Sequence, residues 1–316
     1  MPRIITLTPN PTYDFAVDVA RVEPNRKLRC VNPESHPGGG GLNVARAARR
    51  LGAQTLAIFT AGGLYGAALK GLVAEEGVPL RAVPAAGETR LAFHVRDTGA
   101  SDEYRFNLPG SELSPEERSA MLAALEDETA AGDYVIGSGS LPPMRGERAS
   151  ETFWADAARI AKRKGARFVL DSISGLDAAL DEGVFMLRHN EHEYQALAGG
   201  PLPWPDAIAA FAQQLVNDGK AERVIITHGA DGSVLATRDR LIFSPIFPVR
   251  AHSAVGAGDS FVAGFIVALL QGQSDEAALR MGAACAAATR LSSGTSLFDK
   301  ADVDRLIAQR QTAAGD

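Results

Sequence analysis

Short apolar runs alternate with segments of helical periodicity along most of the chain. Runs rich in β-branched and apolar residues predict buried strands, and apolar residues spaced three and four apart predict helices that pack on them. The predicted strands are 4–8, 55–60, 134–137, 167–171, 184–188 and 223–227, and the predicted helices are 42–51, 65–76, 115–128, 150–164, 191–198 and 206–217. This alternation predicts an α/β fold in three layers, with a mostly parallel central sheet flanked by helices.

Two stretches break this rhythm, because strand-like segments follow each other there without an intervening helix. Such a pattern is typical of antiparallel ribbons. The first ribbon pairs 14–19 with 27–31, and the second pairs 89–97 with 103–108. We expect a single domain over residues 1–316, with the ribbons inserted at about 12–34 and 88–109 as a small antiparallel β lid.

The composition is that of a globular protein, with 46% hydrophobic and 22% charged residues. A net charge of −6 argues against nucleic acid as a partner, because that role requires a basic face. Cys30 and Cys285 lie far apart without metal-like spacing, so a reducing compartment is expected. The N-terminus lacks a signal-peptide pattern, and the apolar run 261–270 is shorter than the roughly 20 residues of a membrane span. We therefore expect a cytoplasmic protein without a membrane partner.

Chemistry is indicated first by a glycine turn that leads directly into an apolar helix, at Gly256, Ala257, Gly258 and Asp259. Glycines allow successive backbone N–H groups to point at one spot, and the helix N-terminus adds partial positive charge there. An aspartate at such an anion hole can accept the proton of an attacking hydroxyl while the N–H groups stabilise a phosphoryl group. An aspartate in a first helical turn is also stabilising by itself, so the turn alone leaves both interpretations open.

A second glycine run, Pro37 followed by four glycines, opens another predicted helix that contains Asn43. Consecutive glycines cost conformational entropy, which is justified where a ligand or a neighbouring backbone comes close. Asn43 offers a donor and an acceptor to sugar hydroxyls. Neither glycine motif has the Walker or the Rossmann pattern, which argues against a nicotinamide dehydrogenase. Taken alone, the second run could also be a flexible loop.

Taken in order, these motifs resemble the ribokinase-like sugar kinases, and within them the phosphofructokinase B group, over essentially the whole chain. The matching elements are Leu7-Thr8-Pro9-Asn10-Pro11 with Asp14, residues 38–43, Gly139-Ser140-Leu141-Pro142-Pro143, Asn190-x-x-Glu193 and residues 256–259. The resemblance is strongest to the 6-phosphofructokinase branch, through Lys27-Leu28-Arg29-Cys30 and residues 37–41. Fructose-1-phosphate kinases typically place a lysine where this chain has Gly40.

The resemblance implies a ribokinase-like fold and an ATP- and Mg²⁺-dependent kinase that converts fructose 6-phosphate to fructose 1,6-bisphosphate, as in glycolysis. It implies that Asp259 is the catalytic base and that residues 256–258 form its anion hole. The substrate-binding positions that it implies are Asp14, Lys27, Gly39, Gly40, Asn43, Arg90, Arg105 and Ser140. Among these, Lys27, Arg90 and Ser140 would receive the phosphate already on the sugar, because phosphate requires charge-assisted donors. Any one of these cations, taken alone, could be a solvated surface charge.

The nucleotide side follows from the same resemblance. The implied nucleotide-binding positions are Arg188, Asn190, Thr227, Gly229, Gly232 and Ser292. Glu193 would organise Mg²⁺ through water, because this ion keeps much of its water shell and is held by few carboxylates. The chain departs from the usual pattern at Arg188-His189, at Ala254 and at Ser292, which leaves the nucleotide contacts there open. His189 and His192 are three apart without an evident third ligand, so we interpret them as surface residues and not as a zinc site.

Other functions stay open at this point. Fructose 1-phosphate or tagatose 6-phosphate would use nearly the same residues, and a non-catalytic sugar-phosphate sensor could retain the fold. Exposed strand edges on the ribbons predict a homodimer through the β lid. Release of ADP with a panel of sugars would discriminate among these functions.

Overall fold

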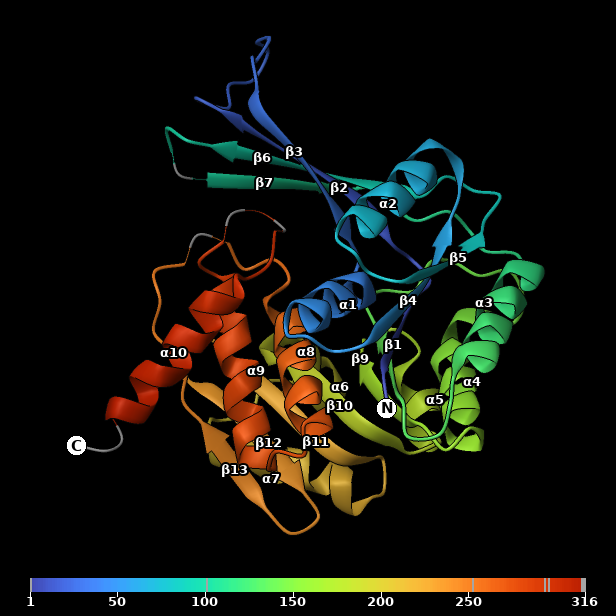
Figure 1. The fold of residues 1–316 in the computed structure, drawn as a ribbon, viewed down its shortest axis with the longest axis vertical. Coiled ribbons are helices and arrows are strands. Elements are labelled where there is room, and N and C mark those ends of the chain that lie inside the picture. The colour runs from blue at the N-terminus through green and yellow to red at the C-terminus, as the bar shows by residue number, and fades with distance from the viewer. Residues whose placement is uncertain (1, 101, 252, 293, 295, 314–316) are drawn as a thin grey trace.

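The structure is a computed structural model that describes residues 2–100, 102–251, 253–292, 294 and 296–313. Within these residues a nine-stranded sheet forms the centre, helices cover its two faces, and a four-stranded sheet projects from one end (Figure 1). The large sheet has the order β13 (Leu241–Ser244), β12 (Gly232–Thr237), β11 (Ala221–His228), β10 (Val184–Asn190), β9 (Arg167–Asp171), β8 (Tyr134–Ser138), β1 (Ile4–Thr8), β4 (Thr55–Ala61) and β5 (Leu80–Pro84). Neighbours from β11 to β5 are parallel, and β12 and β13 add an antiparallel edge. The predicted α/β fold is confirmed.

Buried apolar side chains divide the helices between the two faces of this sheet. The helices are α1 (Gly40–Arg50), α2 (Gly63–Glu75), α3 (Pro115–Glu128), α4 (Ala149–Arg163), α5 (Leu176–Asp181), α6 (Glu191–Ala198), α7 (Asp206–Asn217), α8 (Ala257–Leu270), α9 (Asp275–Thr289) and α10 (Lys300–Ala313). One core cluster joins the sheet to α3, α4 and α7 through Met121, Trp154 and Ile208. Another joins it to α8 and α9 through Phe265 and Leu279. In the described part of the chain, none of the helices is long and apolar enough to cross a membrane.

The sequence signals for these elements have direct counterparts in the structure. All five residues of β1 are buried, as expected for a parallel strand that is covered on both faces. Ser114 and Glu117 form the predicted capping box, in which the Glu117 carboxylate accepts from Ser114 N at 2.7 Å. The alternation of strands and helices thus positions the loops at the two ends of the sheet.

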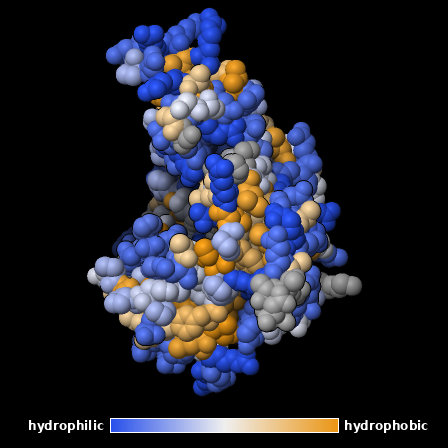
Figure 2. All heavy atoms as spheres, turned by 90° about the vertical axis from the view of Figure 1, so that its left-hand side faces the viewer, coloured by the Kyte–Doolittle hydropathy of each residue, from blue (hydrophilic) through white to orange (hydrophobic). Residues whose placement is uncertain are grey.

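The four-stranded sheet, called the small sheet below, has the order β3 (Val31–Gly38), β2 (Thr12–Val19), β6 (Arg90–Asp97) and β7 (Asp102–Asn107). Both predicted ribbons are antiparallel, and they join each other through a parallel pairing of β2 with β6. In the space-filling view the small sheet stands above the rest of the molecule, with a hollow beneath it (Figure 2). The sheet therefore has the placement expected of a lid.

The predicted strand over residues 27–31 is wrong in position. Pairing with β2 begins only at Val31, which lies opposite Asp18, so Lys27 belongs to the connection between β2 and β3. Asn25 and Asn32 have φ angles of 60° and 50°. Asn25 lies in the connection before β3, and Asn32 lies within β3, next to the point where the pairing with β2 shifts register. The connection therefore extends past Lys27, because β3 begins only at Val31.

Candidate active site

The carboxyl ends of central strands and the N-termini of two helices meet at one edge of the large sheet. Strands β8 and β9 end there at Ser138 and Asp171, and helices α1 and α8 begin there at glycine turns. Ligands of open α/β sheets bind at the carboxyl ends of the strands. The fold thus unites two glycine motifs that are far apart in the sequence.

Asp259 lies in the first turn of α8, and both of its carboxylate oxygens accept hydrogen bonds. Asn43 Nδ2 donates to Oδ2 at 2.9 Å, and Ser138 Oγ donates to Oδ1 at 3.4 Å. Burial raises the pKa of Asp259 to about 7, the negative charge of Asp171 also raises it, and the two hydrogen bonds lower it. A carboxyl group with a pKa near neutrality can both accept and return a proton under ordinary conditions.

Arg188, on β10, holds a positive charge beside this carboxyl group. Its guanidinium donates to Asp171 Oδ1 at 3.2 Å and to Thr227 Oγ1 at 2.7 Å, and Nη1 lies 3.9 Å from Glu193 Oε2. It also packs against the glycine turn, because a Cβ at Gly258 would lie 2.6 Å from Arg188 Nη1. A cation is therefore fixed next to a helix N-terminus, where the backbone favours an anion.

The four-glycine run is an ordered turn whose glycines are required by close neighbours. A Cβ at Gly38 would lie 2.4 Å from the Asp14 carboxyl group, and one at Gly40 would lie 2.2 Å from Ser138 Oγ. Gly39 has a φ of 109°, which L-residues with a side chain rarely adopt. The run therefore allows the start of α1 to lie directly against Asp14 and Ser138.

Arg90 and Ser140 are brought together through Asn10. Asn10 Nδ2 donates to Ser140 Oγ at 3.0 Å, and Arg90 Nη2 donates to the Asn10 carbonyl at 3.3 Å. Arg90 begins β6 opposite Thr12, two residues before the buried Asp14 on β2. Burial raises the pKa of Asp14 to about 6. A guanidinium, a hydroxyl and a carboxyl group thus converge on the side of the site that faces the small sheet.

Lys27 and Arg105 do not join this group within one chain. Lys27 is exposed in the connection that follows Val19, at the far end of β2. The eight residues of β2 separate it from the end at which Arg90 pairs, a distance of about 23 Å at the usual rise of a strand. Arg105 is exposed on β7 and forms an ion pair with Glu103 at 2.5 Å.

The Asn190-x-x-Glu193 element forms a reciprocal cap at the start of α6. Asn190 Oδ1 accepts from the N–H groups of His192 and Glu193 at 2.9 and 3.0 Å, and Glu193 Oε2 accepts from Asn190 N at 2.7 Å. Burial and the neighbouring Asp171 raise the pKa of Glu193. Within the described residues no cluster of three His, Cys, Asp or Glu could hold a metal ion. Mg²⁺ requires only one or two carboxylates in addition to substrate phosphates, so Glu193 fits this ion.

A cavity of about 90 Å³ lies beyond Thr227, between the last strands and helices α8 and α9. Residues that line it include Thr227, Gly229, Gly232, Phe247, Phe261 and Ala287. Three of the predicted nucleotide-side residues are therefore brought together around apolar walls, which suit a planar base. Ser292 lies in the turn after α9, and Arg290 lines the cavity from that region instead.

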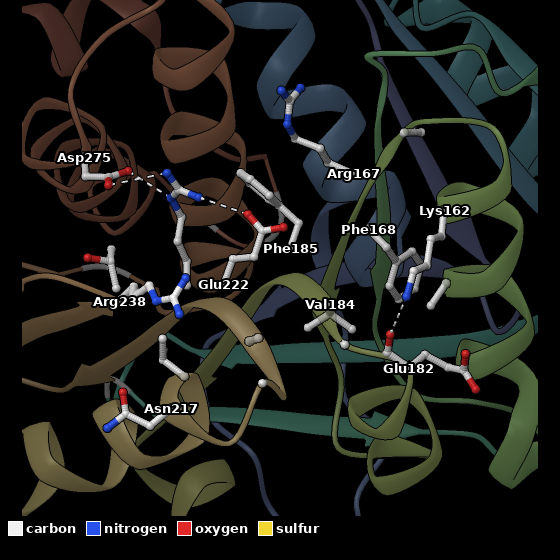
Figure 3. Close-up of a pocket in the computed structure, with 18 of the residues that line it drawn as sticks. Lys162, Arg167, Phe168, Glu182, Val184, Phe185, Asn217, Glu222, Arg238 and Asp275 are labelled. Atoms are coloured by element: carbon white, nitrogen blue, oxygen red, sulfur yellow. Dashed lines mark hydrogen bonds and ion pairs between the residues drawn. The ribbon is translucent and has the colours of Figure 1, made fainter.

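A larger groove, of about 1200 Å³, lies at the amino ends of β9, β10 and β11, opposite the carboxyl ends that form the site (Figure 3). It is lined by Arg167, Val184 and Ala221, which are the first residues of β9, β10 and β11. Charges within it neutralise one another, as in the ion pair of Arg223 Nε with Asp275 Oδ1 at 2.9 Å. The groove is therefore distinct from the carboxyl-end site.

His189 is buried, so its prediction as a surface residue is wrong. Its side chain lies in a central strand that is covered on both faces, and the residue is 1% exposed. Its Nε2 lies 3.3 Å from the Ser172 carbonyl oxygen. In such a strand, successive residues on both faces are buried. The sequence does not reveal this burial, because Arg188 and His189 are two polar residues in succession.

Ser138 and Arg46 contribute to the site and were not predicted from the sequence. Ser138 ends a buried strand directly before Gly139 and Ser140, which was the available signal. Arg46 follows Asn43 by three residues and therefore lies on the same face of α1. Its Nη1 donates to Asn43 Oδ1 at 3.0 Å.

Residues 8–301 match the pfkB family of carbohydrate kinases. A relative from Mycobacterium tuberculosis, named ATP-dependent 6-phosphofructokinase isozyme 2, is 38% identical over 316 residues, with 99% of this chain and 92% of the relative covered. A Bacillus subtilis protein named 1-phosphofructokinase is 31% identical over 299 residues, with 93% and 95% covered. The solved structure of Escherichia coli Phosphofructokinase-2 in complex with substrates and products has a TM-score of 0.90 at 36% identity, with 97% of this chain and 99% of that chain covered.

These matches define the class of the protein as an enzyme that transfers phosphate to an alcohol group of a carbohydrate. The chain belongs to the pfkB family of carbohydrate kinases. The resemblance and the fold predicted from the sequence are both confirmed.

Proposed function

We propose that the protein is an ATP-dependent kinase that converts fructose 6-phosphate to fructose 1,6-bisphosphate. The observation that carries this proposal is the partly buried Asp259, which stands in the glycine turn at the start of α8 and accepts a hydrogen bond from Asn43 at 2.9 Å. The 38% identity to a protein named 6-phosphofructokinase supports the same substrate.

In the proposed reaction Asp259 accepts the proton of the free hydroxymethyl group of the sugar. With a pKa of about 7, this base is substantially deprotonated at neutral pH and still basic enough for proton transfer. The hydroxyl oxygen that loses this proton attacks the γ-phosphorus of ATP in line. The bond from that phosphorus to the β-phosphate oxygen breaks, which releases ADP. The backbone N–H groups of residues 256–258 and the guanidinium of Arg188 stabilise the charge of the phosphoryl group during transfer.

The carboxylate of Glu193 would hold Mg²⁺ through water. When bound, this ion neutralises charge on the β- and γ-phosphates of the nucleotide. Arg188 lies 3.2 Å from Asp171 and 3.9 Å from Glu193. Its position keeps both carboxylates oriented toward the site before the nucleotide arrives.

The sugar phosphate would be received by Arg90 and Ser140, and Asp14 and Asn43 would orient the sugar hydroxyls. Gly40 supports the 6-phosphate over the 1-phosphate, because related fructose-1-phosphate kinases typically have a lysine at this position. A Cβ here would lie 2.2 Å from Ser138 Oγ and 2.8 Å from the Gly139 nitrogen. This chain therefore has no room for that lysine without a shift of its backbone.

Fructose 1-phosphate is the second candidate substrate. The 31% identity to a protein named 1-phosphofructokinase favours it, and either isomer offers one phosphate and one free hydroxymethyl group. The two sugar phosphates differ in which carbon carries the free hydroxymethyl group that reaches Asp259. The preference for one substrate over the other therefore depends on the residues around Gly40.

The proposal includes a homodimer that forms through the small sheets. Three apolar side chains are exposed on or beside the edge strands of the small sheet: Val31 at 56%, Phe106 at 53% and Leu108 at 47%. Apolar atoms lie among polar ones on this part of the surface (Figure 2). Exposed strand edges favour pairing with a second chain. A two-fold interface presents the same segment of each copy to the other. Lys27 lies far from the site of its own chain, and in such a dimer it would approach the site of the second copy.

The test is ADP release with Mg-ATP and a panel of fructose 6-phosphate, fructose 1-phosphate, tagatose 6-phosphate, fructose and ribose. We expect the highest kcat/KM with fructose 6-phosphate. Preference for fructose 1-phosphate would support the second candidate, and the absence of ADP release with every sugar would indicate a sugar-phosphate sensor.

A further inference from the structure

We propose that Arg46 is a positioning residue for the catalytic base, because it determines which atom of the Asn43 side-chain amide faces Asp259. This inference rests on the proposed role of Asp259 and adds a residue that does not touch the substrate. It concerns a hydrogen-bonded chain that runs from Asp259 through Asn43 and Arg46 to Glu76.

The guanidinium of Arg46 is enclosed between α1 and the start of the glycine run. Arg46 is 1% exposed. Its Nη1 donates to Asn43 Oδ1 at 3.0 Å and to the Pro37 carbonyl oxygen at 2.8 Å. The same nitrogen thus contacts the amide beside the base and the backbone that leads from the small sheet into the four glycines.

The direction of these hydrogen bonds follows from chemistry. A guanidinium has five donors and no acceptor, so only the oxygen of the Asn43 amide can face Arg46. The amide nitrogen must then point the other way, where it donates to Asp259 Oδ2 at 2.9 Å. With the amide reversed, two oxygens would face each other at Asp259 and two sets of donors would face each other at Arg46.

Glu76 and Arg50 fix Arg46 in turn. Arg46 Nε donates to Glu76 Oε1 at 2.8 Å, and Arg50 Nη2 donates to Glu76 Oε2 at 3.2 Å. Arg50 also donates to the Phe298 carbonyl oxygen at 2.9 Å. The neighbouring arginines hold the pKa of Glu76 below its usual value despite burial, so this carboxylate is ionised at neutral pH. A charge pair of this kind, in which Arg46 is buried and Glu76 is partly exposed, is a weak source of stability, but it holds the guanidinium in one orientation.

Asp259 is faced by groups from four elements. Asn43 lies on α1, Ser138 ends β8, Asp171 ends β9 and Arg188 lies on β10. Of these, Asp171 opposes ionisation of Asp259, and the other three favour it. Loss of the correctly oriented Asn43 donor would therefore favour the protonated form of Asp259. Because a general base must be deprotonated, the acidic limb of the kcat profile would move to higher pH.

The experiment measures kcat and KM between pH 5.5 and 9 for the full-length enzyme and for Arg46→Met. We expect a kcat lower by on the order of tenfold at pH 7, an acidic limb displaced upward by roughly one pH unit, and a deficit that shrinks above pH 8.5. A role in folding alone would lower activity equally at all pH values. The proposal is wrong if the acidic limb of Arg46→Met coincides with that of the unmodified enzyme.

Two further variants separate orientation from charge and from folding. Arg49→Met removes an exposed arginine from the same helix that takes no part in this hydrogen-bonded chain, so its acidic limb should stay in place. In an Asn43→Ala background, Arg46→Met should produce no additional displacement, because the amide through which it acts is gone. A displacement in that background would show that the charge of Arg46 acts directly, which contradicts the proposal.

Arg46→Lys provides a variant that retains the charge if Arg46→Met does not fold. A lysine offers a point charge without the planar fork, so we expect a partial return of the limb toward its original position. The proposed function has a separate outcome: normal turnover in Asp259→Asn would overturn the role of the base itself. Loss of turnover in Asp259→Asn, combined with an unmoved limb in the Arg46 variants, would overturn only this inference.

Discussion

The floor of the site and the outer part of the small sheet are built in opposite ways. At the floor, Asn43 and Arg188 are buried and Asp259 is partly buried, and hydrogen bonds join them to one another or to Asp171 before any ligand is present. At the outer end of the small sheet, Lys27 is exposed in a connection between strands. One chain thus brings together the residues proposed for proton and phosphoryl transfer. The basic groups proposed for the sugar phosphate, in contrast, lie apart from one another within one chain.

The largest effect should come from the floor, in Asp259→Asn. The substitution keeps the shape of the side chain but removes the proton acceptor, so turnover should fall by on the order of 10²–10⁴, the usual contribution of a general base. Turnover with fructose 6-phosphate and Mg-ATP is the measurement, and thermal unfolding reports whether the fold is retained.

Asp206→Asn is the matched control for this variant. Asp206 also lies in the first turn of a helix, α7, but it is exposed and far along the chain from the glycine turns. We expect its turnover to be unchanged. Comparable losses in both variants would support the interpretation of Asp259 as an ordinary stabilising residue of a first helical turn.

A smaller effect should distinguish the inner from the outer part of the small sheet. Arg90→Ala removes the proposed charge-assisted donor to the sugar phosphate, worth about 1.5–3 kcal/mol, so KM for fructose 6-phosphate should rise roughly 10- to 150-fold. Turnover should change less, because Arg90 contacts Asn10 and is not one of the residues that hydrogen-bond to Asp259.

Arg105→Ala is the comparison for Arg90→Ala. Arg105 is exposed and already paired with Glu103, so KM should change by less than about threefold, consistent with the small value of exposed ion pairs. If KM rises equally in both variants, Arg105 also contacts the substrate, and the small sheet must close farther over the site than it does in this structure.

The sequence predicts the floor well, because its parts are local. The glycine turns at the starts of α1 and α8 are visible in the sequence as short runs. The strands β8 and β9, which end at the same site, are mostly apolar segments with buried residues. The order of strands then brings Asn43 against Asp259. The partners of these residues are harder to predict, because Ser138 and Arg46 contact them from elements whose packing is decided only in three dimensions.

The small sheet shows what a local pattern cannot determine. Alternation identifies both ribbons, but β3 pairs with β2 only from Val31 onward, so Lys27 falls in the connection before that strand. Likewise, the Asn190-x-x-Glu193 element has the spacing of a helix cap, and its capping hydrogen bonds exist whether or not a metal is bound. A motif can thus carry a structural task in addition to any role toward a ligand.

The subtlest prediction asks whether Lys27 acts on the site of its own chain or on that of a second copy. Lys27→Ala and Asp259→Asn homodimers should each be impaired. If Lys27 acts across the dimer, a hybrid of the two contains one site with an intact base and an intact lysine. Because half of the dimers in an equal random mixture are hybrids with one functional site of two, activity should recover to about a quarter of the unmodified level.

The control mixture is Arg90→Ala with Asp259→Asn. Arg90 contacts Asn10 of its own chain, so both sites of that hybrid remain defective and no recovery is expected. Subunit exchange can be verified with differently tagged chains before activity is measured. Recovery in neither mixture, after exchange is verified, would place Lys27 in its own site or outside any site and would remove the homodimer from the account of substrate binding. Recovery only with Lys27→Ala would show that the floor belongs to one chain and the outer phosphate contact to its partner.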